Sequence, residues 1–144
     1  MNRLALGAVA GAAGSAAWAA TEPLLERAFS TTYSDVRLVG RLVSPGRLWP
    51  LTGLAAHTAL GAGLGATLAL TGQTSVGHAF LAMQVENAVT WPGMALVDRR
   101  HPDTQSGRWP RLLTSRRVFA QNAATRVVFA LGFAWCATRL AEQG

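Results

Sequence analysis

The chain has 144 residues, of which 50% are apolar and only 14% are charged, whereas about a quarter are charged in ordinary soluble domains. Its formal net charge is +6, and all 13 basic residues are arginine, which we attribute first to a GC-rich genome. The single cysteine, Cys136, excludes an internal disulfide and a metal site built on cysteines. This composition favours a membrane protein over a soluble domain.

The first predicted transmembrane span covers residues 4–27. It carries no charge through Thr21 and is rich in Ala and Gly, so its hydrophobicity is modest. A cleaved secretory signal is the alternative, with Arg3 as its basic start and Ala17-Trp18-Ala19 as its cleavage site. We favour a retained span because the stretch lacks a compact leucine core.

The connection after this span is basic and contains a short helical pattern. Ser34 is a suitable N-cap, and the residues that follow alternate apolar with polar at helical spacing until Ser44-Pro45-Gly46. We predict a short amphipathic interfacial helix that lies on the bilayer.

The second and third predicted spans, residues 48–70 and 76–97, lie mostly in a run of 38 residues between Arg47 and Glu86 without a charged side chain. As helix, this run is about 57 Å long, close to two crossings of the hydrocarbon core. A soluble domain of this size has too little remaining chain to bury such a hairpin. Pro92-Gly93 predicts a kink in the third helix.

A fourth predicted span, residues 118–138, completes an all-α integral membrane four-helix bundle within a single transmembrane domain. Four arginines lie between Glu22 and Arg47 and six between Asp98 and Arg117, against only Arg3 and Arg139 on the opposite side. The positive-inside rule then predicts a bacterial cytoplasmic membrane with both termini outside.

The two halves of the chain, 1–72 and 73–144, resemble each other. Trp18, Trp49-Pro50 and Ala59-Leu60-Gly61 have counterparts in Trp91, Trp109-Pro110 and Ala130-Leu131-Gly132, in the same order. This order predicts two repeated transmembrane hairpins. Chance resemblance in a chain rich in Ala, Gly and Arg is the open alternative.

Small residues at spacing four predict close helix packing. Gly7 and Gly11 lie on one face of the first span, and Gly61 and Gly65 on one face of the second. We expect these faces to pack against each other, with a homo-oligomeric contact as the competing interpretation.

Ionisable residues at membrane depth are the main candidates for function. Counted from the inner ends of their spans, His57, Glu86 and Arg126 lie about 13, 16 and 12 Å deep. Because a lone charge there is expensive, we expect Glu86 and Arg126 to pair. The predicted polar membrane cluster is completed by Asn87, Thr90 and Asn122. It is either a structural lock or a pathway or site for a proton or ion.

The second connection is basic enough to contact anionic lipid headgroups. The predicted contacts are Arg99, Arg100, Arg108, Arg111, Arg116 and Arg117. A role limited to enforcing topology is the alternative, and nucleic-acid binding is not expected because the spans hold these residues at a membrane.

No motif identifies an enzyme, and we predict no catalytic residues, no metal site and no cofactor. His101 and Asp103, beside Asp98, could bind a metal or serve acid/base chemistry at headgroup level, but a loop turn with an N-cap Asp is the simpler interpretation. We therefore expect a non-catalytic protein that packs with itself or with a larger membrane partner. The alternatives are a small proton or ion transporter and, third, a membrane enzyme acting on lipid headgroups.

Overall fold

The computed structural model describes residues 2–44 and 46–142, and every regular element in these ranges is helical. The elements are α1 (Arg3–Phe29), α2 (Asp35–Val43), α3 (Trp49–Leu70), α4 (Val76–Thr90), the 3-10 turn η1 (Trp91–Gly93), α5 (Met94–Arg100), α6 (Pro102–Gln105) and α7 (Arg116–Glu142). The prediction of an all-α fold is confirmed.

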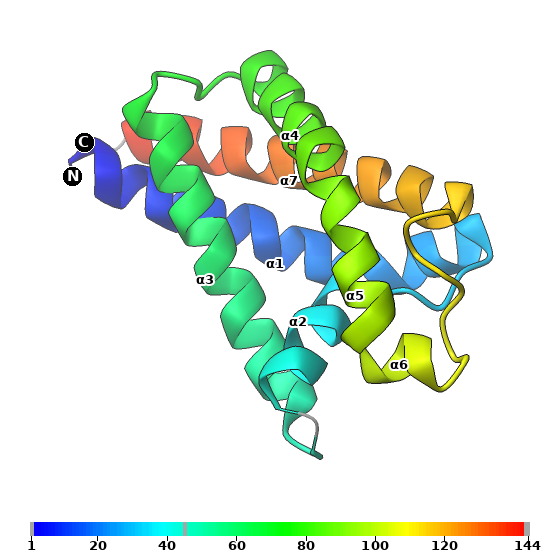
Figure 1. The fold of residues 1–144 in the computed structure, drawn as a ribbon. Helices are drawn as coiled ribbons and strands as arrows, with labels where there is room; N and C mark the ends of the chain where they lie inside the picture. The colour runs from blue at the N-terminus through cyan, green and yellow to red at the C-terminus, as the bar shows by residue number, and fades with distance from the viewer. Residues whose placement is uncertain (1, 45, 143–144) are drawn as a thin grey trace.

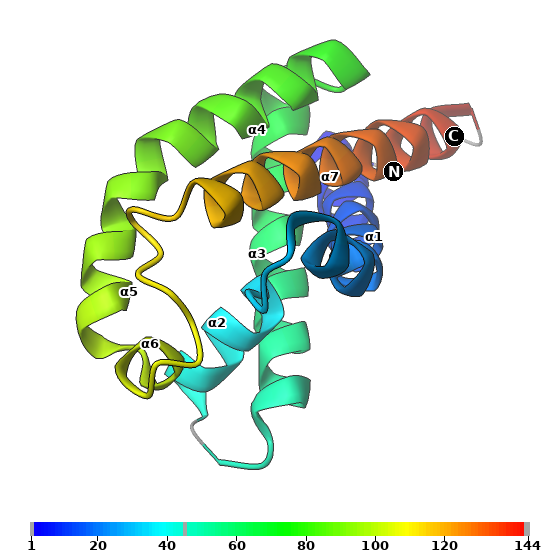
Figure 2. The same cartoon turned by 90° about the vertical axis from the view of Figure 1, so that its right-hand side faces the viewer.

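Helix α1 is the centre of the bundle and packs against both α3 and α7. Both ends of the chain lie at the same end of the molecule, because α1 and α7 run side by side in opposite directions (Figure 1). Helix α4 packs on α7, and α5 continues it as an arm that descends past α2 (Figure 2).

The predicted glycine faces form the α1–α3 contact. A Cβ atom on Gly11 would lie 2.1 Å from the carbonyl oxygen of Gly61, and one on Gly65 would lie 2.3 Å from that of Gly7. The two backbones therefore touch, as the spacing of small residues predicts. These faces are occupied within one chain, which leaves them covered and not open to a second copy.

Helix α2 begins where the sequence predicts, with the Ser34 side chain accepting a hydrogen bond from the Arg37 backbone N–H. It packs on the first half of α3, since a Cβ atom on Gly40 would lie 2.2 Å from the carbonyl oxygen of Trp49. It ends at Val43, and Pro45 of the predicted stop lies outside the described residues. Contact with a bilayer stays a prediction.

The third predicted span is not one continuous α-helix. The turn η1 divides it at Trp91–Gly93, where Pro92 lacks the N–H that a continuous helix would use, so the predicted kink is present. Helix α7 has the required length, but it carries Gln121, Asn122 and Arg126 in its first half.

By length and composition, two of the described helices, α1 and α3, could cross a membrane. The finding is thus a helical bundle with two candidate spans. The four-span arrangement remains a proposal.

Candidate functional site

The interior of the bundle is unusually polar for a chain of this composition. The buried polar side chains of the long helices are Ser15, Glu22, His57, Asn87, Gln121, Asn122, Thr125 and Arg126. They come from α1, α3, α4 and α7, so all the long helices turn polar groups toward one another. Buried polar groups must find hydrogen-bond partners within the protein, and most of these do.

Glu86 and Arg126 form the expected ion pair across the α4–α7 contact. The Nε atom of Arg126 lies 2.8 Å from Oε2 of Glu86, and the two side chains are 7% and 34% exposed respectively. The Nη1 atom of Arg126 also donates to the side-chain and backbone oxygens of Asn122. The exposed Thr90 hydroxyl donates to Glu86 Oε1 over 3.2 Å. The structure therefore brings four of the six predicted cluster residues together.

His57 belongs to the same interior, and Trp18 lies in contact with both His57 and Arg126. The centroid of the Trp18 indole lies 5.0 Å from the centroid of the His57 imidazole. The same indole also contacts Arg126, whose guanidinium carbon lies 5.2 Å from the indole centroid. Such cation–π contacts stabilise a partly desolvated arginine. Trp18 was not predicted as part of the polar membrane cluster, which was chosen from ionisable, amide and hydroxyl side chains.

Three buried polar atoms near this pair lack a hydrogen-bond partner in the part of the chain that the structure describes. They are Nε1 of Trp18, Nε2 of His57 and Oδ1 of Asn87. An unpartnered buried donor or acceptor costs about 1–3 kcal/mol. His57 and Asn87, the other two residues of the predicted cluster, are therefore buried, but Nε2 of His57 and Oδ1 of Asn87 make no hydrogen bond to the ion pair.

The polar interior continues into the first connection, which the sequence analysis placed on the membrane surface. The Asn122 amide contacts the Tyr33 hydroxyl over 3.5 Å, and this hydroxyl donates to Oδ1 of Asp35 over 2.8 Å. Burial raises the pKa of the Asp35 carboxyl, although the positive charge of Arg126 acts to lower it. Burial and the Asp35 charge likewise raise the pKa of the Tyr33 hydroxyl. Tyr33 is the only tyrosine in the chain, and that rarity was the available signal.

Glu22 is a second acidic residue that sequence reasoning missed. Its side chain, with the residue 4% exposed, accepts hydrogen bonds from the backbone N–H groups of Asp35 and Val36 and from the Ser34 hydroxyl. A carboxylate is favourable at the N-terminus of a helix, where N–H groups are unpaired. Glu22 therefore fastens α2 to α1.

His101 and Asp103 are both buried and make structural contacts, although Nε2 of His101 has no hydrogen-bond partner in the described residues. Nδ1 of His101 accepts the Asp103 backbone N–H, and its ring stacks on Trp109 at 4.5 Å. The Asp103 carboxylate pairs with Arg41 at 3.2 Å and Arg108 at 3.3 Å.

Burial would raise the pKa of the Asp103 carboxyl, but these two cations hold it below its usual value. Burial lowers the pKa of His101. The cap of α6 is His101, so the expectation of an Asp cap was wrong.

The arginines predicted to contact lipid lie on the surface of the basic connection. Arg99, Arg100, Arg108, Arg111, Arg116 and Arg117 are all exposed. Within the described ranges, no group of three or more His, Cys, Asp or Glu side chains is arranged to hold a metal ion.

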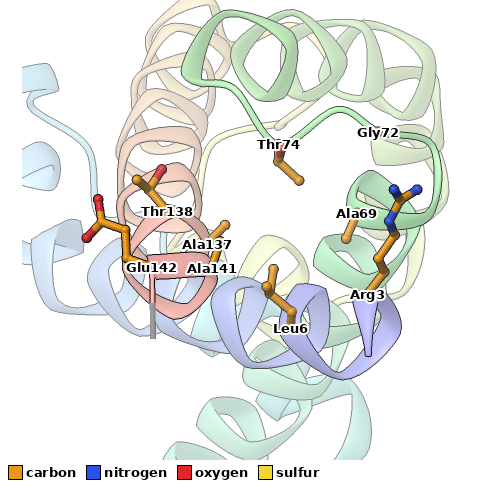
Figure 3. Close-up of a pocket in the computed structure, with 9 residues that line it drawn as sticks. All are labelled: Arg3, Leu6, Ala69, Gly72, Thr74, Ala137, Thr138, Ala141 and Glu142. Atoms are coloured by element: carbon orange, nitrogen blue, oxygen red, sulfur yellow. The ribbon is translucent and has the colours of Figure 1, made fainter. Parts of the chain in front are cut away.

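Two grooves open on the sides of the bundle. One of about 680 Å³ lies between the ends of α1, α3 and α7, with an apolar floor that includes Leu6 and Ala137 and with Arg3 and Glu142 on opposite sides (Figure 3). The other, of about 730 Å³, runs between the α3–α4 turn and α4, and Glu86 lines it together with His78. The ion pair is therefore reachable from the outside through its carboxylate.

Comparison of the chain with models of protein families, with curated proteins and with solved structures finds no match. The proposals below therefore rest on the geometry alone.

Proposed function

We propose that this chain is a multi-pass membrane protein of non-catalytic type, which acts by packing with itself or with a larger membrane partner. The observation that carries the proposal is the distribution of polarity on the long helices. Glu22, Arg126 and several amide and hydroxyl side chains are buried between these helices, whereas many large apolar side chains on them are exposed. Polar residues within membrane bundles face the interior in this way.

The outward apolar surface is extensive. Leu51 on α3, Val89 on α4 and Trp135 on α7 are 69%, 72% and 66% exposed, and only 33% of the apolar window of each candidate span is buried. A core helix of a soluble protein would be mostly buried. Exposure of this many large apolar side chains favours a contact with lipid or with another protein.

The proposed topology has four crossings, made by α1, α3, the α4–η1–α5 arm and α7, with both termini outside the cytoplasm. Termini at the same end of the bundle agree with an even number of crossings. The exposed arginines of the second connection would then lie at the inner surface, where anionic headgroups attract them.

A non-catalytic role is supported by how the polar interior is used. Glu22 caps α2, Asp103 holds two arginines, and Glu86 holds Arg126. Of the residues of the enzyme hypothesis, Asp103 pairs with two arginines and Nδ1 of His101 caps α6, while Nε2 of His101 has no hydrogen-bond partner among the described residues. Because most of their polar atoms make structural contacts, that hypothesis has the least support.

One observation favours the second candidate, a small proton or ion transporter. Glu86 is the exposed partner of its ion pair and lines the groove beside α4, while His57 and Trp18 present unpartnered atoms deeper inside. A carboxylate that lies between an open groove and buried polar atoms without hydrogen-bond partners is suited to carry a proton.

Two substitutions separate these candidates. If the pair is structural, Glu86→Gln and Arg126→Met each impair folding or assembly in membranes, and the double variant restores much of it, since breaking a buried pair costs more than replacing it. If the pair carries transport, the double variant assembles normally but abolishes a proton or ion flux across liposomes. Flux through the wild type and its loss in the assembled double variant would contradict the non-catalytic packing role.

A further inference from the structure

A third pocket, of about 600 Å³, lies at the basic end of the molecule, between α5, α6 and the loop that leads to α7. Arg99 and Arg111 line it together with Thr104, Trp109 and Leu113. It is separate from the ion pair and from the two grooves on the sides of the bundle.

The walls of this pocket are held in place by specific hydrogen bonds. The Asp98 carboxylate accepts the backbone N–H groups of Leu112 at 2.7 Å and Leu113 at 3.1 Å. The Trp91 indole N–H donates to the Leu113 carbonyl over 3.1 Å, and the Gln105 amide donates to the Asp98 carbonyl over 2.9 Å. A site whose walls are fixed before binding loses less conformational entropy when a ligand enters.

The pocket offers an excess of positive charge. Arg99 and Arg111 are exposed, and neither has an ion-pair partner within residues 2–44 and 46–142, whereas Arg108 and Arg41 are committed to Asp103. The Asp98 carboxylate also lines the pocket, but its two oxygens each accept a backbone N–H. Two guanidinium groups against one occupied carboxylate favour an anion, and guanidinium matches phosphate oxygens in geometry.

A hydroxyl adds a second, independent indication. Oγ1 of Thr104, another lining residue, is hidden from solvent and has no hydrogen-bond partner in the described part of the chain. As placed, this oxygen does not face the open pocket, so its donation to a bound oxygen requires rotation about the Cα–Cβ bond of Thr104, which would also remove the cost of an unsatisfied group.

The edge of the pocket favours a lipid as the source of that anion. Leu113 is 39% exposed, and Ala95 lies beside Leu96, which is 53% exposed on α5. On α4, which precedes α5, Val89 and Val85 are also exposed, by 72% and 54%. A dissolved anion would gain nothing by contact with these apolar side chains, whereas the acyl chains of a phospholipid would cover them.

We propose that this pocket binds the phosphate headgroup of one anionic phospholipid, with Arg99 and Arg111 on the phosphate, Thr104 on one of its oxygens and the acyl chains along α5 and α4. The inference rests on the proposed membrane location. It differs from a general attraction of lipid to six arginines, because it assigns the binding to two of them and to an uncharged hydroxyl.

The test uses the full chain in nanodiscs or detergent, with phosphatidylglycerol as the probe and phosphatidylcholine as the reference. The variant pair Arg99→Gln/Arg111→Gln is compared with Arg100→Gln/Arg117→Gln, which removes the same charge from exposed arginines that do not line the pocket. We expect the first pair to lower phosphatidylglycerol affinity about tenfold or more, and the second to lower it less than about threefold.

Thr104→Val supplies a readout that net charge does not affect. It should reduce the preference for phosphatidylglycerol over phosphatidylcholine about threefold to tenfold, since it removes one donor. Thermal unfolding of each variant shows whether the fold is intact, and all the substituted arginines are exposed, so folding should be preserved.

Equal losses for the two arginine pairs would overturn the proposal in favour of general surface attraction. Binding of inorganic phosphate that depends on Arg99 and Arg111, without preference for the lipid, would overturn the assignment to a lipid. If the chain fails to retain any lipid and stays monodisperse without detergent, the membrane location itself is wrong, an outcome distinct from failure of the pocket.

Discussion

Substitution of Gly11 by alanine tests the contact that holds the bundle together. The added Cβ would lie 2.1 Å from the backbone oxygen of Gly61, and ordinary contact begins near 3.4 Å, so α1 and α3 must separate by about 1.3 Å. Both atoms belong to rigid helices, so no side-chain rotation relieves the overlap. Overpacking typically costs about 1–3 kcal/mol, and a gap of this size also forfeits much of the dispersion energy along the interface.

We therefore expect Gly11→Ala to lower the free energy of unfolding by about 2–3 kcal/mol, a large part of the stability of a small protein. The matched control is Gly63→Ala on α3, where nothing lies within 4 Å of the added atom. Unfolding in a titration with sodium dodecyl sulfate, followed by circular dichroism, measures both variants. If Gly11→Ala and Gly63→Ala unfold at the same detergent fraction, the close α1–α3 packing is refuted.

Three further experiments probe other parts of the molecule. Ser34→Ala removes the cap of α2 and should destabilise that helix by about 1 kcal/mol, seen as faster amide exchange in α2 with α7 unchanged. The lowered pKa of Asp103 stabilises the fold above its ordinary value of 3.8 and ceases to do so as the pH falls through the lowered value. Asp103→Asn should therefore reduce stability at pH 7 and flatten the loss of stability in acid, measured by unfolding between pH 2 and 7. Trp135→Phe should remove much of the fluorescence quenching by brominated lipids, because Trp135 is exposed. Trp109→Phe, at a site 2% exposed, should leave the quenching unchanged. The reverse order would contradict the outward apolar surface.

The long elements could be predicted because each depends on local sequence. Apolar runs of helical length place α1 and α3, Ser34 opens α2, and Pro92 breaks the third helix, all through the chemistry of a few neighbouring residues. The contact of Gly11 with Gly65 was predictable for a similar reason, since spacing four puts small residues on one helical face.

The candidate site was only partly predictable because its missing members come from segments with no depth signal. Depth counted along a helix brought Glu86 and Arg126 to one level, and they pair at 2.8 Å. No such count applies to Tyr33 and Asp35, which a connection folds back under the bundle. Glu22 has no predicted role within the span 4–27, although its partner is the N-terminus of another helix.

These missed residues explain why the interior tolerates acidic side chains. Glu22 faces unpaired N–H groups at the start of α2, and Glu86 faces a guanidinium, so each carboxylate meets positive charge that its own helix does not supply. Among the described residues, the Asp35 carboxylate accepts a hydrogen bond from the Tyr33 hydroxyl alone, with Arg126 acting from farther away. Of the three, Asp35 is thus the carboxyl least stabilised in its charged form. If the protein moves protons, Asp35→Asn should impair proton flux as strongly as Glu86→Gln does. If the polar interior is purely structural, Asp35→Asn should lower the free energy of unfolding less than Glu86→Gln does, because it breaks no ion pair.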